Sequence, residues 1–538
     1  MRWFRNNKGA ALPIVIIVLA ISSIFGFFSL SMLDSQARFN IMDDSGKKAM
    51  EYAEAGYNAY LWHLNDNVEF YSTKESDDMQ GVPIEFMDGY YQLSVTRPSD
   101  TDRFITIVST GWTKDNPGIK RTIEAKIRKK QFVHHVYVSN DDGSSIWWTS
   151  GDESHGPYHT NKNLYTREGA SIYNTTLKKT VYYPVFFDTV SYSGTHTENI
   201  RSSYRDDAYL AGNPSKTDIL EFPATNSQLK AWAEKDNMVF YGRTCIYLDG
   251  EYIKIRNGNA SAAEIQTYKI SDIYNKVIYV DKAAGGGTGK FDLESGNIFI
   301  SGTIKGVLTI AAANDIYITY GDPTNWYDYS AGDLSRRNPA PNQPPVSFRW
   351  SNGRYYDYPE YGGIEYESTT FTSSHKPGGE EYYIREANGK DMLGLVANRD
   401  ISILHFNWPK MSVGGDEPCW DFVWRWNNSM GRYVKEGYKY DVAPKDVTIH
   451  SALFAINGGF GFERYDERNE ELEYVRKGDI TIWGSITQRT RRPVGIIDRT
   501  GYNKKYSHDP RMFCDYPPHI LEPVNVGWEI HEWKEVSD

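Results

Sequence analysis

Cysteine is scarce in this chain: Cys245, Cys419 and Cys514 are the only three in 538 residues. A disulfide framework needs a denser set, so the count excludes a small disulfide-stabilised fold. In an exported protein two of the three can pair and leave one thiol over. The sequence does not choose the pair.

The common metal and nucleotide motifs are also missing. His155 and His159 are four residues apart, but neither belongs to an H-E-x-x-H motif, and no cysteine pair has zinc-site spacing. We expect no metal site, and we expect His159 and Asn161 to hydrogen-bond the backbone of a loop. The stretch 284–291 imitates a phosphate-binding loop, but alanine replaces its first glycine and phenylalanine its magnesium-binding hydroxyl residue. We interpret it as a turn and expect no cofactor.

An excess of positive charge is lacking as well. The chain has 70 Asp and Glu against 59 Lys and Arg, a net charge of −11. Nucleic acids bind through basic patches, and the basic clusters 126–130 and 489–492 are short, so we expect no nucleic-acid ligand. No carboxylate pair has a spacing that assigns acid and base roles, so we expect no enzyme.

Only one long hydrophobic run is present, from Ala10 to Met32. As a helix it is roughly 35 Å long, enough to cross a membrane. Basic residues precede it and Asp34 follows it, so the positive-inside rule places 34–538 outside the cytoplasm. We expect a basic leader at 1–9 and a single membrane helix at 10–33, inserted through apolar residues that include Leu12, Ile14, Ile17, Leu19, Phe25 and Phe28.

Three interpretations compete for this segment. A secretory signal cut near Ser29-x-Ser31 is one, although its apolar region is normally about 7–15 residues long. A plain membrane anchor is the second. The third comes from the string Lys8-Gly9-Ala10-Ala11-Leu12-Pro13-Ile14-Val15, which resembles the processing site of type IV pilins and, more narrowly, the start of PilX-like minor pilins.

The resemblance implies that a prepilin peptidase cuts between Gly9 and Ala10 and that the helix stays attached. The protein would then lie in the inner membrane and, after assembly, in a pilus or at the cell surface. Its partners would be other pilins. Major pilins carry Glu at the fifth mature position, where this chain has Ile14. That departure argues against repeated incorporation along a fibre and suits a tip position.

Residues 34–130 are expected to complete a pilin-like α+β module. From Lys47 to about Leu64, apolar residues at i, i+3 and i+4 spacing predict a helix with one apolar stripe and Ser45 as its N-cap. Tyr52-Ala53-Glu54-Ala55-Gly56 resembles a PilX-like segment at the same place. Short β-rich runs then predict a small antiparallel sheet from strands at 91–96, 104–109 and 121–127.

Residues 131–538 are expected to form a mainly-β extracytoplasmic domain. Short apolar runs separated by Gly, Asn or Asp suit a parallel β-solenoid, with a large β-sandwich as the alternative. The expected strands lie at 296–302, 303–310, 314–319, 392–398, 400–404, 446–450, 452–457 and 477–486. Two stretches, 322–390 and 405–445, read as long loop excursions.

The resemblance to PilX-like proteins with large β domains continues through this part. It is carried by the segment 152–161 with its Gly-Pro-x-His-Thr-Asn element, by 391–398, and by Asp509-Pro510-Arg511. It implies a pilus or surface component and supplies no catalytic residues.

Aromatic residues suggest the main alternative, a cell-surface adhesin that stacks its rings on sugars. A polysaccharide-degrading β-helix enzyme is a less favoured one. The adhesin would present rings from the expected loops: Trp147, Trp148, Trp326, Tyr355, Tyr356, Trp420, Trp424 and Trp426. The opposing interpretation is that these rings cap the open faces of the solenoid and hold its loops in place.

Overall fold

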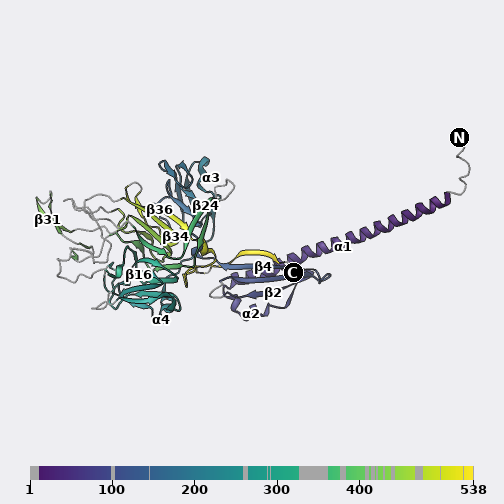
Figure 1. Cartoon of the computed structure of the whole chain (residues 1–538), viewed down its shortest axis with the longest axis horizontal. Helices are drawn as coiled ribbons and strands as arrows, with labels where there is room; N and C mark the ends of the chain where they lie inside the picture. Colours follow the sequence, from purple (N-terminus) through teal and green to yellow (C-terminus); the bar gives the residue numbers. More distant parts are fainter. Residues whose placement is uncertain are drawn as a thin grey trace. The chain divides into compact units, whose positions relative to one another are not determined.

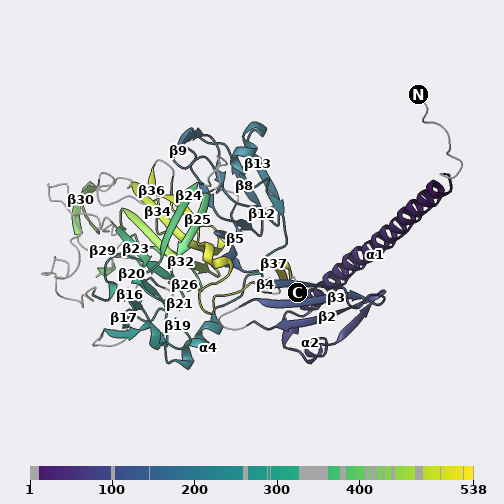
Figure 2. The ribbon, with the colours of Figure 1, turned by 45° about the vertical axis from the view of Figure 1, so that its right-hand side comes forward.

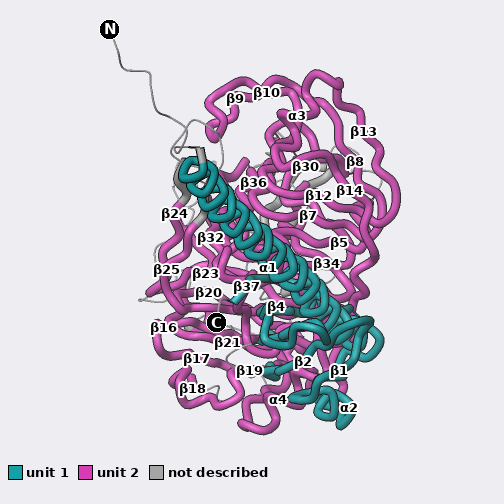
Figure 3. The backbone as a smooth tube through the Cα atoms, turned by 90° about the vertical axis from the view of Figure 1, so that its right-hand side faces the viewer, with its two compact units in different colours: residues 1–130, 525–538 teal, residues 131–524 magenta. Residues whose placement is uncertain are grey.

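A computed structural model of the chain is coloured from N- to C-terminus in Figure 1. It describes residues 11–98, 103–143, 146–257, 265–287, 289–290, 292–325, 361–375, 383–405, 411–412, 418–419, 422–427, 431–437, 443–466, 476–496, 499–524 and 526–536. The chain divides into unit 1, residues 1–130 and 525–538, and unit 2, residues 131–524 (Figure 3).

Unit 1 is a long helix on an antiparallel sheet. Helix α1 (Ala11–Asp66) has 56 residues and is followed by η1 (Phe70–Ser72) and α2 (Lys74–Asp78). The sheet has the order β1-β2-β3-β4-β37. Its strands are β1 (Pro83–Phe86), β2 (Gly89–Thr96), β3 (Ile105–Thr113), β4 (Lys120–Lys129) and β37 (Trp528–Val536). β2 and β4 contain the strands predicted at 91–96 and 121–127, and β3 begins one residue after the start of the strand predicted at 104–109.

The second half of α1 packs on this sheet through the predicted apolar stripe. Ala49, Ala53, Tyr60 and Leu64 are fully buried and meet the inward side chains of β3 and β4. Close approach depends on Gly111 of β3, because a Cβ there would overlap the backbone of Ala49 and Ala53. Helix and sheet therefore share one core.

Ser45 is not an N-cap, contrary to the expectation. Helix α1 runs without a break through residue 45, because nothing between 34 and 47 stops a helix that is already formed. The Ser45 side chain is buried and accepts a hydrogen bond from Asn116 Nδ2 at 3.0 Å.

The C-terminal strand belongs to unit 1. β37 pairs antiparallel with β4, and Arg128 and Arg121 form ion pairs with Glu529 and Glu535 across the two strands. Unit 2 therefore ends at Val524, and not at residue 538 as expected. It is inserted between two neighbouring strands of the unit 1 sheet.

Unit 2 is built around one long sheet of 22 strands in which nearly all pairings are parallel (Figure 2). The strands are β5 (Tyr137–Asp141), β6 (Glu153–His155), β7 (Tyr158–Thr160), β11 (Val185–Phe186), β12 (Val190–Tyr192), β14 (Ser215–Lys216), β15 (Val239–Tyr241), β16 (Thr244–Gly250), β17 (Tyr252–Asn257), β18 (Gln266–Lys269), β19 (Val277–Asp281), β20 (Ile298–Ile304), β21 (Val307–Ala312), β22 (Ile316–Ile318), β23 (Tyr361–Tyr366), β26 (Met392–Ala397), β27 (Ile401–Ile403), β32 (Asp446–Ala455), β33 (Phe460–Phe462), β34 (Arg476–Thr490), β35 (Gly495–Ile496) and β36 (Thr500–His508). Among the residues that the structure describes, the only antiparallel pairs of this sheet are β16–β17, β17–β18 and β35–β36.

Unit 2 also contains two-stranded sheets and short helices outside the long sheet. Four antiparallel two-stranded sheets are β9 (Ile172–Asn174) with β10 (Lys179–Val181), β24 (Thr370–His375) with β25 (Tyr383–Asn388), β28 (Met411–Ser412) with β29 (Pro418–Cys419), and β30 (Phe422–Asn427) with β31 (Arg432–Gly437). A parallel pair joins β8 (Leu164–Arg167) to β13 (His196–Asn199). The helices are η2 (Phe132–His134), η3 (Ser202–Tyr204), α3 (Arg205–Ala208), α4 (Ser227–Lys235), η4 (Ile270–Asp272), η5 (Pro323–Asn325) and η6 (Pro510–Phe513).

The parallel pairing follows the predicted strands, with two corrections. Gly302 bends β20 instead of ending it: Ile298–Ile300 pairs with β22, and Gly302–Ile304 pairs with β23. Its φ of +114° suits glycine, and a Cβ there would overlap the carbonyl oxygen of Leu248. The turn comes later, at Gly306. The expected excursion 322–390 also contains a strand of the main sheet, β23.

The beginning and end of unit 2 meet within this sheet. β34 pairs in parallel with β5, and β36 pairs in parallel with β6, more than 340 residues earlier in the chain. The sheet is therefore completed only when the last strands of unit 2 are in place.

Candidate functional site

The first half of α1, from Leu12 to Met42, is exposed within the protein, and as far as Met32 it is apolar on every side. We call it the bare half. Its most apolar 18-residue window has a mean hydropathy of 2.5, and by length and composition this helix is sufficient to cross a membrane. The exposed fractions of the predicted membrane residues are Leu12 70%, Ile14 58%, Ile17 57%, Leu19 61%, Phe25 68% and Phe28 69%. Gly9 and Ala10 lie outside the described residues.

Lipid or other apolar helices must cover this half of α1, because folded proteins in water rarely leave so large a contiguous apolar surface exposed. A helix that is hydrophobic all round suits lipid or the core of a helix assembly. The two halves of α1 thus have different environments while sharing one backbone. The first charged residues after the apolar run, Asp34 and Arg38, form an i,i+4 ion pair at 2.9 Å.

Of the aromatic residues expected to bind sugars, Trp148 is a core residue. It is 1% exposed and packs against Tyr137, Tyr158 and Phe186, with the Arg491 guanidinium 4.4 Å above its ring. It is therefore not a surface platform, because rings from β5, β7 and β11 and the Arg491 guanidinium surround it.

Trp147 is half-buried and packs on Tyr165, with Arg167 5.7 Å over its ring. Trp326, Tyr355, Tyr356 and Trp420 lie outside the described residues. Trp424 and Trp426 lie on β30, of which the backbone is described. For these residues sugar stacking stays a prediction.

The two spaced histidines lie on strands β6 and β7 and not in a loop. His155 Nε2 is 2.6 Å from Glu153, and His159 contacts Ser191 and Asn161 at 2.9 Å each. Asn161 binds the backbone of Leu220 through both its amide nitrogen and oxygen, as the sequence predicts for a residue that holds a turn. Among the residues that the structure describes, no group of three His, Cys, Asp or Glu could hold a metal ion.

Lys290 is the lysine of the stretch 284–291, which resembles a phosphate-binding loop. Its side chain is half-buried and forms an ion pair with Glu463. The oxygens of residues 289 and 290 accept hydrogen bonds from Asn297 Nδ2 at 3.0 and 2.9 Å. These contacts fix the segment as a turn against the sheet.

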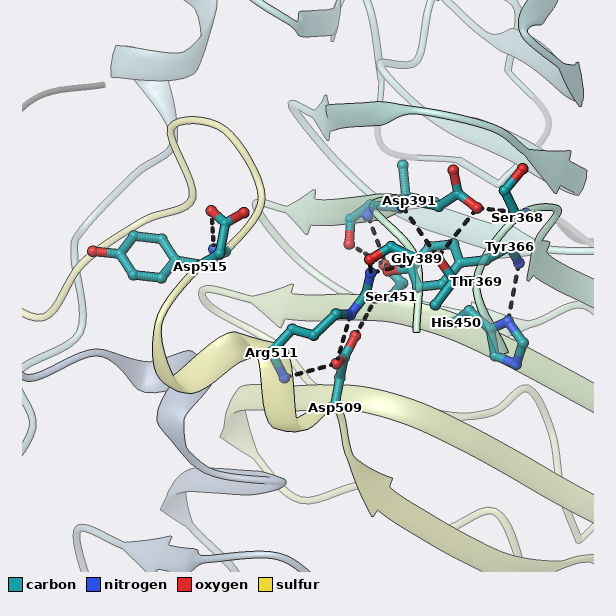
Figure 4. Close-up of polar contacts among 12 residues, drawn as sticks. Tyr366, Ser368, Thr369, Gly389, Asp391, His450, Ser451, Asp509, Arg511 and Asp515 are labelled. Carbon is teal, nitrogen blue, oxygen red and sulfur yellow. Dashed lines mark hydrogen bonds and ion pairs between the residues drawn. The ribbon is translucent and has the colours of Figure 1, made fainter. Parts of the chain in front are cut away.

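A network of mostly buried polar groups joins the turn before β26 to the segment 509–511 (Figure 4). The Asp391 carboxylate accepts backbone N–H bonds from Gly306 at 2.8 Å and Ser368 at 2.6 Å, and the Thr369 hydroxyl donates to it at 3.2 Å. Arg511 binds Asp509 with two nitrogens and the Gly389 carbonyl with a third, at 3.0 Å. Asp391 and Arg511 thus hold the turns at Gly306, Ser368 and Gly389 next to one another.

His450 belongs to the same region. Its Nδ1 accepts the backbone N–H of Tyr366 at 2.9 Å, which leaves the proton of the neutral ring on Nε2. Burial lowers the pKa of His450 to about 4. A neutral, fixed imidazole of this kind supports the framework and does not exchange protons near neutral pH.

A second buried cluster lies where the first and last strands of unit 2 meet. Lys504 Nζ donates to Asp152 at 2.8 Å, and Asp142 accepts hydrogen bonds from Ser139 and Tyr158 and lies 3.6 Å from Arg491. Burial lowers the pKa of Lys504, and the negative charge of Asp152 opposes that shift. Breaking a buried pair costs about 3–5 kcal/mol, so the cluster penalises a wrong strand pairing.

No protein-family model matches this chain. No curated protein matches it either. Among solved structures the chain is similar to the crystal structure of the competence-associated pilin ComZ from Thermus thermophilus, with 10% identity over 91% of this chain and 98% of that one, and a TM-score of 0.24. That TM-score is too low to establish a common fold.

Proposed function

We propose that this chain is a PilX-like minor pilin: a membrane-inserted component of a type IV pilus or a related filament that displays unit 2 outside the cytoplasm. The observation that carries the proposal is the continuity of α1. One helix leaves an apolar half bare on all sides and packs its other half on a small antiparallel sheet. A freely secreted protein has no use for the bare half.

The bare half has two successive partners in this proposal. In the inner membrane, lipid covers it, since about 20 apolar residues suffice to span the hydrocarbon core. In a filament, the apolar half-helices of neighbouring pilins replace lipid. Ile14 in place of a glutamate removes a charge that would need a partner at every repeat. The protein therefore suits a single place, such as a tip.

Unit 2 supplies the specificity of the assembly. We propose that its parallel strands wind as a solenoid, which is supported by the successive parallel pairs β19–β21, β21–β26, β26–β32 and β32–β34. Its work is assembly or adhesion and not catalysis. The carboxylates described above, in Asp142, Asp152, Asp391 and Asp509, are committed to buried hydrogen bonds and ion pairs.

Leader removal tests the proposal. The full chain and its Gly9→Arg variant are expressed with a prepilin peptidase, and the N-terminal peptide is identified by mass spectrometry. We expect the unmodified chain to begin at Ala10 and Gly9→Arg to keep its leader. Asn7→Arg is the matched control, since it adds the same charge beside the site and is expected to be cut. An unmodified chain that still begins at Met1 contradicts the proposal.

A further inference from the structure

A basic pocket lies on unit 2, although the chain as a whole is acidic. Its volume is about 660 Å³, a size typical of small-ligand sites. The polar lining comprises Lys269, Lys276, Lys305, Lys390, Glu251, Asp391, Ser271 and Ser368. Four lysines against two carboxylates leave a surplus of two positive charges, on a chain whose net charge is −11.

The parallel sheet brings these residues together from separate turns. Lys305 lies in the turn between β20 and β21, and Lys390 lies between β25 and β26. Gly306 and Asp391 of these two turns are hydrogen-bonded to each other at 2.8 Å, so the turns are held side by side (Figure 4 shows Asp391 and Ser368). The third wall is the segment from Lys269, the last residue of β18, to Lys276.

The lysines differ in how they are engaged. Lys276 donates to the carbonyl oxygens of Ile270 and Ser271, at 2.7 and 3.0 Å, and supports the wall. Lys305 and Lys269 share a single carboxylate, Glu251, at 3.0 and 3.8 Å. Lys390 is exposed and has no carboxylate within ion-pair distance among the described residues. The Asp391 carboxylate is already occupied by hydrogen bonds from two backbone amides.

We propose that this pocket binds the carboxylate of an acidic saccharide, such as an oligomer of uronic acid. Lys305 and Lys390 hold the anion, and the half-buried Val307 offers apolar surface to the C–H face of the sugar. Hydroxyls and backbone groups of Ser271, Ser368 and Gly389 serve the sugar hydroxyls. The identification of a glycan depends on the proposed function, because a displayed surface domain meets the polysaccharides of cells and their surroundings.

Nucleic acid fits the pocket less well. Binding to a polyanion gains from many phosphate contacts along a track, and here a surplus of two charges sits on an acidic chain. One or two carboxylates match this charge.

The test uses the full chain in detergent and isothermal titration calorimetry at low ionic strength. Tetragalacturonate is the probe, with the neutral galactose tetrasaccharide, inorganic phosphate and a DNA duplex as comparison ligands. We expect tetragalacturonate to bind and the neutral sugar not to bind. The double variant Lys305→Gln/Lys390→Gln is expected to bind at least about tenfold more weakly.

Lys282→Gln is the matched control. Lys282 is an exposed lysine of unit 2 outside the pocket, so its loss is expected to leave binding unchanged. Thermal unfolding of each variant confirms that the fold is intact. The proposal is overturned by no binding, by equal binding of the neutral sugar, by tighter binding of phosphate or DNA, or by an equal loss in Lys282→Gln. None of these outcomes alters the N-terminal result that tests the pilin proposal.

Discussion

The two halves of α1 differ in surroundings although they form one helix. From Leu12 to Met42 the helix has no preferred face and nothing in the protein covers it, whereas from Ser45 to Leu64 one stripe is buried on the sheet. A pair of glycines shows the contrast. A Cβ at Gly26 meets nothing within 4 Å, while one at Gly56 overlaps Ser109 and comes within 2.8 Å of the Tyr91 ring. The apolar pattern, and not helix propensity, decides what each half contacts.

The largest effect is expected where the packed half touches backbone. Gly111→Val places a side chain against backbone atoms of Ala49 and Ala53, which can move only with the helix. We expect a loss of about 3 kcal/mol or more in the unfolding free energy of unit 1. Hydrogen exchange measured by mass spectrometry over 49–64 reports it. Gly26→Val is the control, and equal protection in both variants would show that the two halves do not differ.

A charge in the bare half is expected to act on the membrane and not on the fold. Ile17→Asp costs about 2.5–3.5 kcal/mol of insertion free energy near the helix centre. We expect a larger share of the protein to be released from membranes by urea extraction, with unchanged hydrogen exchange over 49–64. Ile17→Leu serves as control. Retention of the Asp variant equal to that of the control would mean that lipid does not cover this half.

The two helical glycines give a smaller and more direct comparison. Gly56→Ala is expected to lower the unfolding free energy of unit 1 by about 1–3 kcal/mol, because Ser109 and Tyr91 are buried and have little room to move. Gly26→Ala is expected to be neutral or stabilising, since alanine favours a helix by about 1 kcal/mol. Chemical denaturation with fluorescence detection measures both. A Gly56→Ala protein as stable as Gly26→Ala would contradict the packing described here.

Alkaline pH is expected to weaken the packing of residues 45–64 of α1 on the sheet and to leave the bare half unaffected. Burial and the hydrogen bond to Asp88 raise the pKa of Tyr52 to about 12 from 10. Between these two values the unfolded chain has lost the proton that the folded chain keeps, so the stability of unit 1 falls as pH rises. Brief alkaline incubation and pulse proteolysis are expected to cut within 49–64, and Tyr52→Phe to reduce that cutting. The same pH profile in both proteins would remove Tyr52 as the cause.

Elements with a strong local pattern were predictable from the sequence. The stripe of Ala49, Tyr60 and Leu64 and the strands near 392–397 and 446–455 follow from apolar periodicity and from runs of β-branched and aliphatic residues. Helix ends were less predictable, because Ser45 is a good N-cap residue only where a helix begins. Gly302 looks like a turn, but a strand can bend at a glycine and continue.

Pairings between distant segments leave no local signal. β37 has four charged residues among nine and no strict apolar alternation, and only its pairing with β4 places it in unit 1. The pocket lysines are spread between residues 269 and 390 and form no motif, since the register of the parallel strands brings them together. Trp148 falls in an expected loop, which predicts a surface ring, whereas contacts with rings from distant strands bury it.

The N-terminus of the native protein, purified from membranes and identified by mass spectrometry, tests the central claim most directly. We predict a chain that begins at Ala10 and keeps the whole of α1. A chain that begins after Met32 would contradict the account, because the bare half of the helix would then have been discarded during export.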